Sequence, residues 1–304
     1  MSNDEATGLV VAAHGRQVIV ENSSRERFNC RMKGRRIRPV CGDYVYWTPM
    51  TEDTVDGVVT GIAGRTNLLQ RPTRRGRDEN VAANLTRMVV VFATQPPADP
   101  FLVDRYIAAA EHLQVECVLV HNKYELADNT DFYWIKPLEN LGYKVVRCSA
   151  KTGSNVEQLT EVCTNGISIL VGQSGVGKSS LLNAMIPGIG QETQEISTSG
   201  KFGRHTTSAS YLFHFPEPST GGLIDSPGVR DFAPPTLSQE QVPNGYIEIF
   251  AAASDCRFAN CRHEHEPQCA VKMGVESGKI EQRRYTSYLQ LMALMRELQG
   301  NLPP

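Results

Sequence analysis

The sequence predicts a multi-domain protein with an N-terminal β-barrel, a central parallel α/β domain and a mainly helical, metal-binding C-terminal domain. Three observations predict this order. Short β-branched or aromatic runs, separated by turn residues, fill residues 7–70. Strand-like apolar runs alternate with helical periodicity from residue 86 onward. Three cysteines cluster between residues 256 and 269. We therefore expect domains at 1–70, 86–235 and 236–304, joined by a basic linker at 71–85.

The composition is that of a folded protein rather than a disordered or membrane-spanning one. The chain has 304 residues, of which 40% are hydrophobic and 21% charged, and its net charge is −2. No apolar run approaches the roughly 18–20 residues that span a bilayer, and Met1–Glu5 has no signal-peptide pattern. We therefore expect a cytoplasmic protein without a membrane partner. Five scattered cysteines are expected to be reduced, small buried side chains: Cys30, Cys41, Cys117, Cys148 and Cys163.

The N-terminal part predicts five strands, at 8–13, 17–21, 28–32, 43–47 and 57–62. Its third strand and the following loop concentrate positive charge against the single acid Glu26. Small five-stranded barrels with a basic face commonly bind nucleic acid; the alternative is a solvated charged face without a partner. The predicted RNA-binding residues are Arg25, Arg27, Arg31, Lys33, Arg35, Arg36 and Arg38. Residues 65–79 add five arginines before Asp78 and predict an extended segment that orders on a phosphate backbone.

The central part predicts a doubly wound parallel sheet. Buried strands are expected at 87–93, 115–120, 144–148 and 167–171, with helices at 101–113 and 155–162. In such sheets, ligands bind at the carboxyl ends of the strands. Functional residues are therefore expected directly after these strands.

A phosphate-binding loop follows the strand at 167–171. Residues 172–180 fit the pattern G-x-x-x-x-G-K-[ST], and a helix-compatible run follows them. Glycines let backbone N–H groups turn toward phosphate oxygens. Lys178 is expected to reach the β- and γ-phosphates, and the Ser179 hydroxyl to bind Mg²⁺. The expected loop residues are Gly172, Gln173, Ser174, Gly175, Val176, Gly177, Lys178, Ser179 and Ser180.

Four further motifs stand at element ends and, as a set, resemble the guanine-nucleotide motifs of small GTPases. They are Asn122-Lys123-Tyr124-Glu125, Ser149-Ala150-Lys151, Thr206-Thr207 and Asp225-x-x-Gly228. The resemblance implies that the first two motifs read guanine, and that Ser179, Asp225 and one of the two threonines, which we assign as Thr207, surround Mg²⁺. Glu125 stands where Asp is usual and is one methylene longer.

The order of these motifs is unusual, because the two guanine-reading motifs precede the phosphate loop. Ordinary GTPases have them last, so the order is that of a circular permutation. With the barrel, Gly203-Arg-His-Thr-Thr207 and the C-terminal cysteines, it resembles the ribosome small-subunit-dependent GTPase A (RsgA) family. The resemblance implies an N-terminal OB-fold and a late-acting 30S assembly GTPase that binds GTP or GDP and 16S rRNA and is stimulated by the small subunit. A monomer is the default expectation.

The C-terminal cysteines predict a structural zinc site. Cys256, Cys261, His263 and Cys269 supply four soft ligands within fourteen residues, which suits a closed tetrahedral Zn²⁺. His265 is a competing imidazole, and the family resemblance favours His263. The alternative is a set of buried thiols without metal. Apolar residues at helical spacing from Ile280 to Leu298 predict either packing or a partner groove. Arg283 and Arg284 in that segment are candidate RNA contacts.

The prediction of a catalytic residue starts from the position after Asp225-x-x-Gly228, which lacks the usual glutamine. Many GTPases place there a glutamine that orients the attacking water, but this chain has Val229. His205, beside the threonines, is the candidate that replaces it; the alternative is a structural or RNA-contacting histidine. Two other functions compete with a GTP-hydrolysing assembly factor. One is an RNA-binding protein that uses nucleotide only as a structural ligand, and the other is an ATP-dependent P-loop enzyme.

Overall fold

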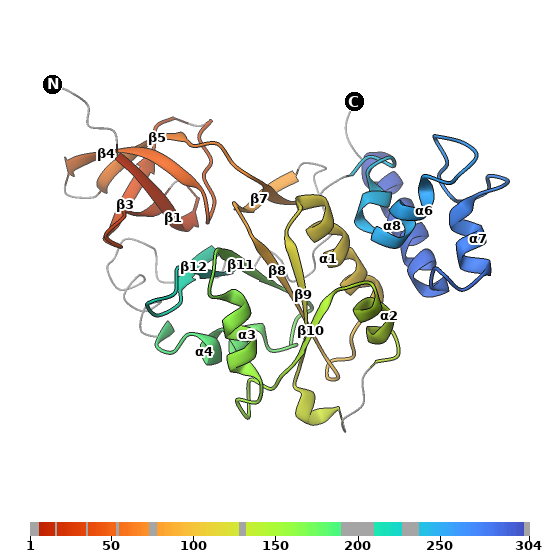
Figure 1. Ribbon diagram of the computed structural model, residues 1–304. Helices are drawn as coiled ribbons and strands as arrows, with labels where there is room; N and C mark the ends of the chain where they lie inside the picture. Colours follow the sequence, from red (N-terminus) through yellow and green to blue (C-terminus); the bar gives the residue numbers. More distant parts are fainter. Residues whose placement is uncertain are drawn as a thin grey trace.

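The computed structural model describes residues 6–15, 17–34, 36–52, 55–72, 78–127, 132–189, 210–226 and 237–300. Figure 1 shows the three parts in sequence order, from the barrel in red and orange, through the central sheet in yellow and green, to the C-terminal helices in blue. Among the described helices, none is both long enough and apolar enough to cross a membrane.

The N-terminal barrel is closed. It consists of β1 (Ala6–His14), β2 (Gln17–Glu21), β3 (Arg27–Met32), β4 (Tyr44–Glu52) and β5 (Val55–Ile62). The strands pair in the order β1-β2-β3-β5-β4, and β4 also pairs with β1, which closes the sheet. Alternate side chains such as Val10, Val45 and Val59 fill the interior with Trp47. The five predicted strands and the OB-fold are confirmed.

The segment expected to be an extended basic linker is partly a hairpin. Strands β6 (Leu68–Pro72) and β7 (Asp78–Ala83) pair antiparallel, while residues 73–77 lie outside the described ranges. Leu69 and Ala82 are fully buried in the main core. The extended interpretation was therefore wrong for these two strands, because burial of their apolar residues stabilises the ordered hairpin. Arg71 pairs with Glu79 across the hairpin, with 2.6 Å between Nη2 and Oε2.

The central sheet is doubly wound, as predicted. Five parallel strands are β8 (Arg87–Ala93), β9 (Glu116–Asn122), β10 (Lys144–Arg147), β11 (Ile167–Val171) and β13 (Gly222–Asp225), with the antiparallel β12 (Ser210–His214) beside them. Their order is β10-β9-β8-β11-β13-β12.

Helices cover both faces of this sheet (Figure 1). On β8, Met88 and Val90 face a core that includes α1 (Pro100–Leu113) and α2 (Ile135–Asn140). Val89 and Val91 face the opposite core, built with α3 (Val156–Cys163) and α4 (Lys178–Met185). Apolar residues on both faces explain why β8 reads as an unbroken hydrophobic run.

The C-terminal part is helical. It contains η3 (Val242–Gly245), α6 (Ile247–Ala253), α7 (Ala270–Glu276) and α8 (Gln282–Gly300). The apolar stripe of α8 is buried, with Tyr288, Met292 and Met295 all at 0% exposure. Ala108 of α1 belongs to the same core. The stripe therefore packs the C-terminal helices and holds them against α1, which excludes the partner-groove alternative for these three residues.

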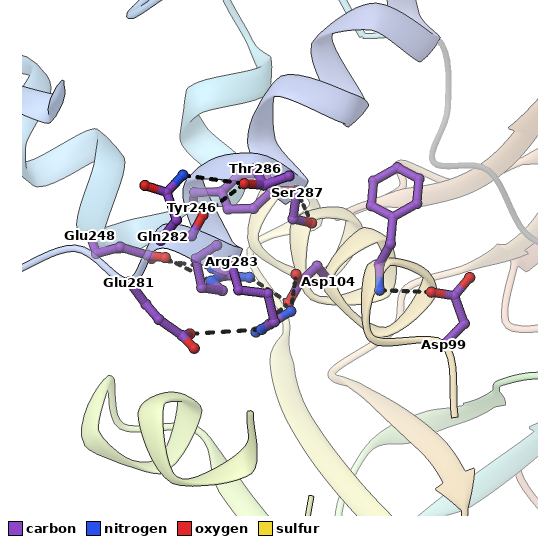
Figure 2. A network of polar contacts seen from close by, with 11 residues as sticks. Asp99, Asp104, Tyr246, Glu248, Glu281, Gln282, Arg283, Thr286 and Ser287 are labelled. Carbon is purple, nitrogen blue, oxygen red and sulfur yellow. Dashed lines mark hydrogen bonds and ion pairs between the residues drawn. The ribbon is translucent and has the colours of Figure 1, made fainter. Parts of the chain in front are cut away.

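A buried charge network joins α8 to α1 (Figure 2). Arg284 Nη1 lies 2.8 Å from Asp104 Oδ1, and its Nε lies 2.7 Å from Glu248 Oε1. Arg283 Nη1 lies 2.6 Å from Asp104 Oδ2. Burial opposes the charge of Arg284, but Asp104 and Glu248 outweigh it and raise its pKa. Arg284 is fully buried, so its expected role as an RNA contact was wrong, and Arg283 is likewise engaged within the protein.

Candidate nucleotide and metal sites

The phosphate loop joins β11 to α4, as its sequence predicts. Gly172 and Gly177 have φ angles of 139° and 94°, which favour glycine. A Cβ at Gly172 would collide with the Val91 carbonyl oxygen, and one at Gly177 with Asn122 Nδ2. Lys178 begins α4 and turns back over the loop, where its Nζ donates to the Gly172 oxygen at 2.6 Å and to the Gln173 oxygen at 2.8 Å. The loop is therefore closely packed around its lysine, and its backbone is held by neighbouring strands.

Asn122 joins the three motifs that the sequence predicted to converge. It ends β9 and is 1% exposed. Its Nδ2 donates to the Val176 oxygen in the phosphate loop at 2.8 Å. Its Oδ1 accepts from the Ala150 N–H, in the Ser149-Ala150-Lys151 loop, at 3.1 Å. Segments that are far apart in the sequence therefore meet at one amide group.

Lys123 also connects these segments, through hydrogen bonds from its side chain. Its backbone is left-handed, with φ of 57°. Its Nζ donates to the Gln95 and Gly175 oxygens, both at 2.8 Å. Gln95, just after β8, was not among the predicted site residues, and it enters only because the parallel sheet places β8 between β9 and β11.

The other residues that the sequence predicts to read guanine surround this corner. Tyr124 donates its backbone N–H to the Cys148 oxygen at 3.1 Å. Ser149 is buried, and its Oγ accepts from the Thr152 N–H at 3.1 Å. Glu125 and Lys151 are exposed. The two loops are thus tied together by backbone contacts, which leaves the charged ends of Glu125 and Lys151 available to a ligand.

A buried aromatic cluster supports this corner. His121, at 0% exposure, stacks on Phe92 with ring centroids 5.2 Å apart. Its Nε2 lies 3.1 Å from Thr94 Oγ1, and Phe132 and Tyr124 also contact the imidazole ring. The sequence analysis missed this cluster, because its members come from three separate segments and only the fold brings them together.

Asp225 ends β13, which lies parallel to β11 with Ile224 opposite Ile169. Its backbone therefore stands at the same edge of the sheet as the phosphate loop. His205, Thr206, Thr207 and Gly228 lie outside the described residues.

The four predicted metal ligands meet in one cluster. The sulfur atoms of Cys256, Cys261 and Cys269 and a ring nitrogen of His263 all lie within 4.8 Å of one another. His263 Nδ1 is 3.4 Å from Cys269 Sγ and 3.5 Å from Cys256 Sγ. A tetrahedral Zn²⁺ with Zn–S bonds of about 2.3 Å would separate its ligands by about 3.8 Å. The cluster thus fits a metal ion, and His263, rather than the exposed His265, contributes the nitrogen atom of the cluster.

Neighbouring groups hold these ligands in place. The Tyr285 hydroxyl donates to the His263 oxygen at 2.5 Å. The Glu266 carboxylate accepts from the N–H groups of Arg262 and Glu264, both at 2.9 Å. Burial alone would raise the pKa of Glu266, but these backbone donors lower it to about 2. Burial lowers the pKa of His263, which favours the neutral imidazole that binds metals.

The predicted basic face divides into two groups. Arg31, Lys33, Arg36 and Arg38 are exposed on β3 and the segment after it. Arg27 instead pairs with Glu21 at 3.2 Å, and Arg25 donates to the Ser219 oxygen in the central domain at 3.4 Å. Arg35 lies outside the described residues. The first group faces solvent, whereas the second lies where the barrel meets the central sheet.

Comparison with known proteins finds a matching family model and similar chains. Residues 62–234 match the family model described as RsgA GTPase. The protein named small ribosomal subunit biogenesis GTPase RsgA of Pseudomonas aeruginosa (strain LESB58) is 39% identical over 297 residues, covering 96% of this chain and 86% of the relative. The protein of that name from Photorhabdus laumondii is 37% identical over 303 residues, covering 96% of this chain and 85% of the relative.

Two solved structures are similar over nearly their whole length. The crystal structure of YjeQ from Thermotoga maritima has 32% identity and a TM-score of 0.75, and the match covers 97% of this chain and 99% of that one. The crystal structure of YloQ, described as a circularly permuted GTPase, has 26% identity and a TM-score of 0.70, with 100% and 98% covered.

Proposed function

The chain belongs to the RsgA GTPase family. We propose that its two guanine-reading loops and its phosphate loop form a single GTP site, and that the protein uses this site when it acts on the small ribosomal subunit. The protein is a GTPase of 30S subunit biogenesis. The observation that carries the site assignment is Asn122, whose side chain bonds to Val176 in the phosphate loop and to Ala150 in the second guanine-reading loop. An ATP-dependent P-loop enzyme would not need the Asn122 side chain to join these two loops.

The nucleotide contacts follow from the geometry. The glycine-rich backbone before α4 and Lys178 would hold the phosphates. Ser179, Thr207 and Asp225 would hold Mg²⁺, which neutralises phosphate charge when bound. Guanine would lie against the loops of Asn122 and Ala150, where the exposed Glu125 carboxylate can accept two N–H bonds from the base. The other members of the proposed site are Gly172, Gln173, Ser174, Gly175, Gly177, Ser180, Lys123, Tyr124, Ser149, Lys151, Thr206 and Gly228.

We assign the orientation of the attacking water to His205. The position after Asp225-x-x-Gly228 is Val229, which has no polar group, and His205 directly precedes Thr206 and Thr207 in the sequence. His205→Ala should lower turnover in the presence of 30S subunits by at least about 100-fold and leave the affinity for GDP unchanged. Loss of GDP affinity in this variant would instead give His205 a binding role.

The partners follow from the same family membership. We propose that the exposed basic group Arg31, Lys33, Arg36 and Arg38 binds 16S rRNA, and that the protein works as a monomer in the cytoplasm, where small subunits are assembled. We propose that the Cys₃His cluster holds structural Zn²⁺, because four protein ligands leave no open position for catalysis.

Turnover with and without ribosomal particles tests this function. GTP hydrolysis should be slow for the isolated protein and strongly stimulated by 30S subunits, with 50S subunits as the control. Sedimentation with 30S subunits should depend on whether GDP or a non-hydrolysable GTP analogue is bound. Equal turnover with and without 30S subunits would favour the alternative in which nucleotide is only a structural ligand.

A further inference from the structure

Strand β12 belongs to two structures at once. One of its edges pairs with β13 of the central sheet, and its other edge pairs with β1 of the barrel. Tyr211 lies opposite Asp225 on one side and opposite Ala12 on the other. Across the sheet, Tyr211 is therefore the one residue between Asp225, whose carboxylate is predicted to bind Mg²⁺, and the backbone of β1 in the barrel. Figure 1 shows β12 at the edge of the central sheet that faces the barrel.

The start of β12 adjoins two motifs, Thr206-Thr207 in the sequence and Asp225-x-x-Gly228 through a hydrogen bond, which we call the switch motifs, and it is also bonded to the barrel. Ser210 follows Thr207 by three residues in the sequence. Its Oγ donates to Ser226 Oγ at 2.8 Å, and Ser226 directly follows Asp225. The Cys41 thiol donates to the Ser210 oxygen at 3.0 Å. Burial raises the pKa of Cys41, so the thiol stays protonated and remains a donor.

The far end of β12 contacts the barrel through a histidine and a buried carboxylate. His214 Nε2 lies 2.7 Å from Glu21 Oε1, and the two side chains are 16% and 4% exposed. Glu21 also pairs with Arg27, and Arg25 donates to the Ser219 oxygen just beyond β12. Because the Glu21 carboxylate contacts β12 through His214, a shift of β12 is expected to move Glu21 with it.

The direct strand pairing at this junction is short. Only Ala12–Tyr211 and Ala13–Ser210 are in register between β1 and β12 among the described residues. Polar contacts at both ends of β12 add to this pairing. The barrel residues Val11, Ala12 and Ile19 also share one apolar core with Leu212 and Ile224 of the central sheet. A shift of β12 is therefore transmitted to β1 by packing as well as by hydrogen bonds.

We propose that β12 couples the nucleotide state of the two switch motifs to the position of the RNA-binding barrel, with the Glu21–His214 pair as its latch. The proposal rests on the proposed function, because it assumes that GTP and rRNA are the ligands of the two domains. Coupling of this kind is reciprocal, so RNA bound to the barrel changes nucleotide affinity by the same factor as nucleotide changes RNA affinity.

Amide hydrogen exchange of the full chain, in GDP and in a non-hydrolysable GTP analogue, tests the coupling without ribosomes. Exchange in the barrel segments 10–13 and 17–21 should differ between the two nucleotides. Glu21→Gln and His214→Leu should abolish that difference and preserve nucleotide binding. Glu79→Gln is the matched control, since Glu79 pairs with Arg71 on the β6–β7 hairpin away from β12. It should behave like the unmodified protein.

Identical barrel exchange in both nucleotides would overturn the proposal. So would a difference that survives in both latch variants, and two variants guard against one of them failing to fold. A parallel measurement of 30S affinity in each nucleotide distinguishes failure of the coupling from failure of the proposed function. The ratio of the two affinities should shrink in the latch variants. If the protein does not bind 30S subunits but hydrogen exchange in the barrel still depends on the nucleotide, the proposed function is rejected and the coupling is supported.

Discussion

Single residues on the guanine side of the site are held by the phosphate loop itself. Asn122 and Lys123 donate from their side chains to the Val176 and Gly175 carbonyl oxygens. Any change in the loop backbone therefore also displaces the residues that read the base. This arrangement makes phosphate binding and base recognition interdependent, since each donor has an acceptor that belongs to the other half of the site.

Gly177→Ala tests this dependence. Its φ of 94° strains any side chain, and the new Cβ would collide with Asn122 Nδ2. Gly188 has nearly the same φ, 93°, and a Cβ added there would have nothing within 4 Å, so Gly188→Ala isolates the backbone cost. Gly188→Ala should lose about 1–2 kcal/mol of folding stability from backbone strain, and Gly177→Ala should lose more because of the added collision. Only Gly177→Ala should weaken GDP binding, by at least about tenfold. Equal GDP affinity in the two variants, measured by titration, would contradict the packing account.

At the scale of elements, α1 and α8 are joined by a largely buried charge network, in which Asp104 and Arg284 are fully buried. Asp104 is fully buried and faces both Arg283 and Arg284. Proteins often tolerate replacement of a whole buried charge network by apolar residues, but removal of Asp104 alone takes from Arg283 and Arg284 the carboxylate that they share. The network therefore specifies how the C-terminal helices sit on α1.

Asp104→Asn should lower the free energy of unfolding by about 3 kcal/mol, because the fully buried Arg284 and the mostly buried Arg283 lose their shared countercharge. Glu116→Gln is the matched control. Glu116 pairs with Arg87 at 2.7 Å but is 46% exposed, so its loss should cost less than about 1 kcal/mol. Urea unfolding measures both changes. Equal effects in the two variants would show that burial of the network adds nothing.

The loop that carries the proposed metal ligands contains Glu266, whose carboxylate accepts three backbone N–H groups. Glu266→Gln should speed loss of Zn²⁺ to a chelator and lower the melting temperature of the C-terminal helices, whereas Glu276→Gln, exposed on α7, should change neither. Metal content and far-ultraviolet circular dichroism are the measurements. Unchanged chelation kinetics in Glu266→Gln would contradict this role.

The same carboxylate predicts a pH dependence. Its pKa is lowered to about 2 in the folded state, so its stabilising contribution is present above the ordinary Glu pKa and is lost as the pH falls toward 2. The unmodified protein should therefore lose more stability than Glu266→Gln over that acidic range.

At the scale of the whole molecule, patterns local in sequence were predicted and contacts remote in sequence were not. Alternation and β-branching located all five barrel strands, and motif spacing located the residues that meet at Asn122. The burial of Arg284 was not predictable, because its partner Asp104 is 180 residues away. The hairpin at 68–83 was missed because clustered arginines outweighed its few apolar residues in the sequence pattern.

The two groups of basic residues on the barrel should behave differently. Arg36→Ala removes an exposed charge, so it should weaken 30S binding and reduce the salt dependence of that binding by about one charge. Arg27→Ala should leave the salt dependence unchanged, because Arg27 already pairs with Glu21. Sedimentation across a salt series distinguishes them. Equal salt slopes in both variants and the unmodified protein would remove the exposed group from the RNA surface.

The central claim is that loops met in permuted order along the chain form one guanine-nucleotide site. Competition against a fluorescent GDP measures this most directly, with GTP and ATP as competitors and Asn122→Ala as the variant. GTP should displace the probe at concentrations at which ATP does not, and Asn122→Ala should bind the probe at least about tenfold more weakly. Displacement by ATP as effective as by GTP, with unchanged affinity in Asn122→Ala, would contradict the account.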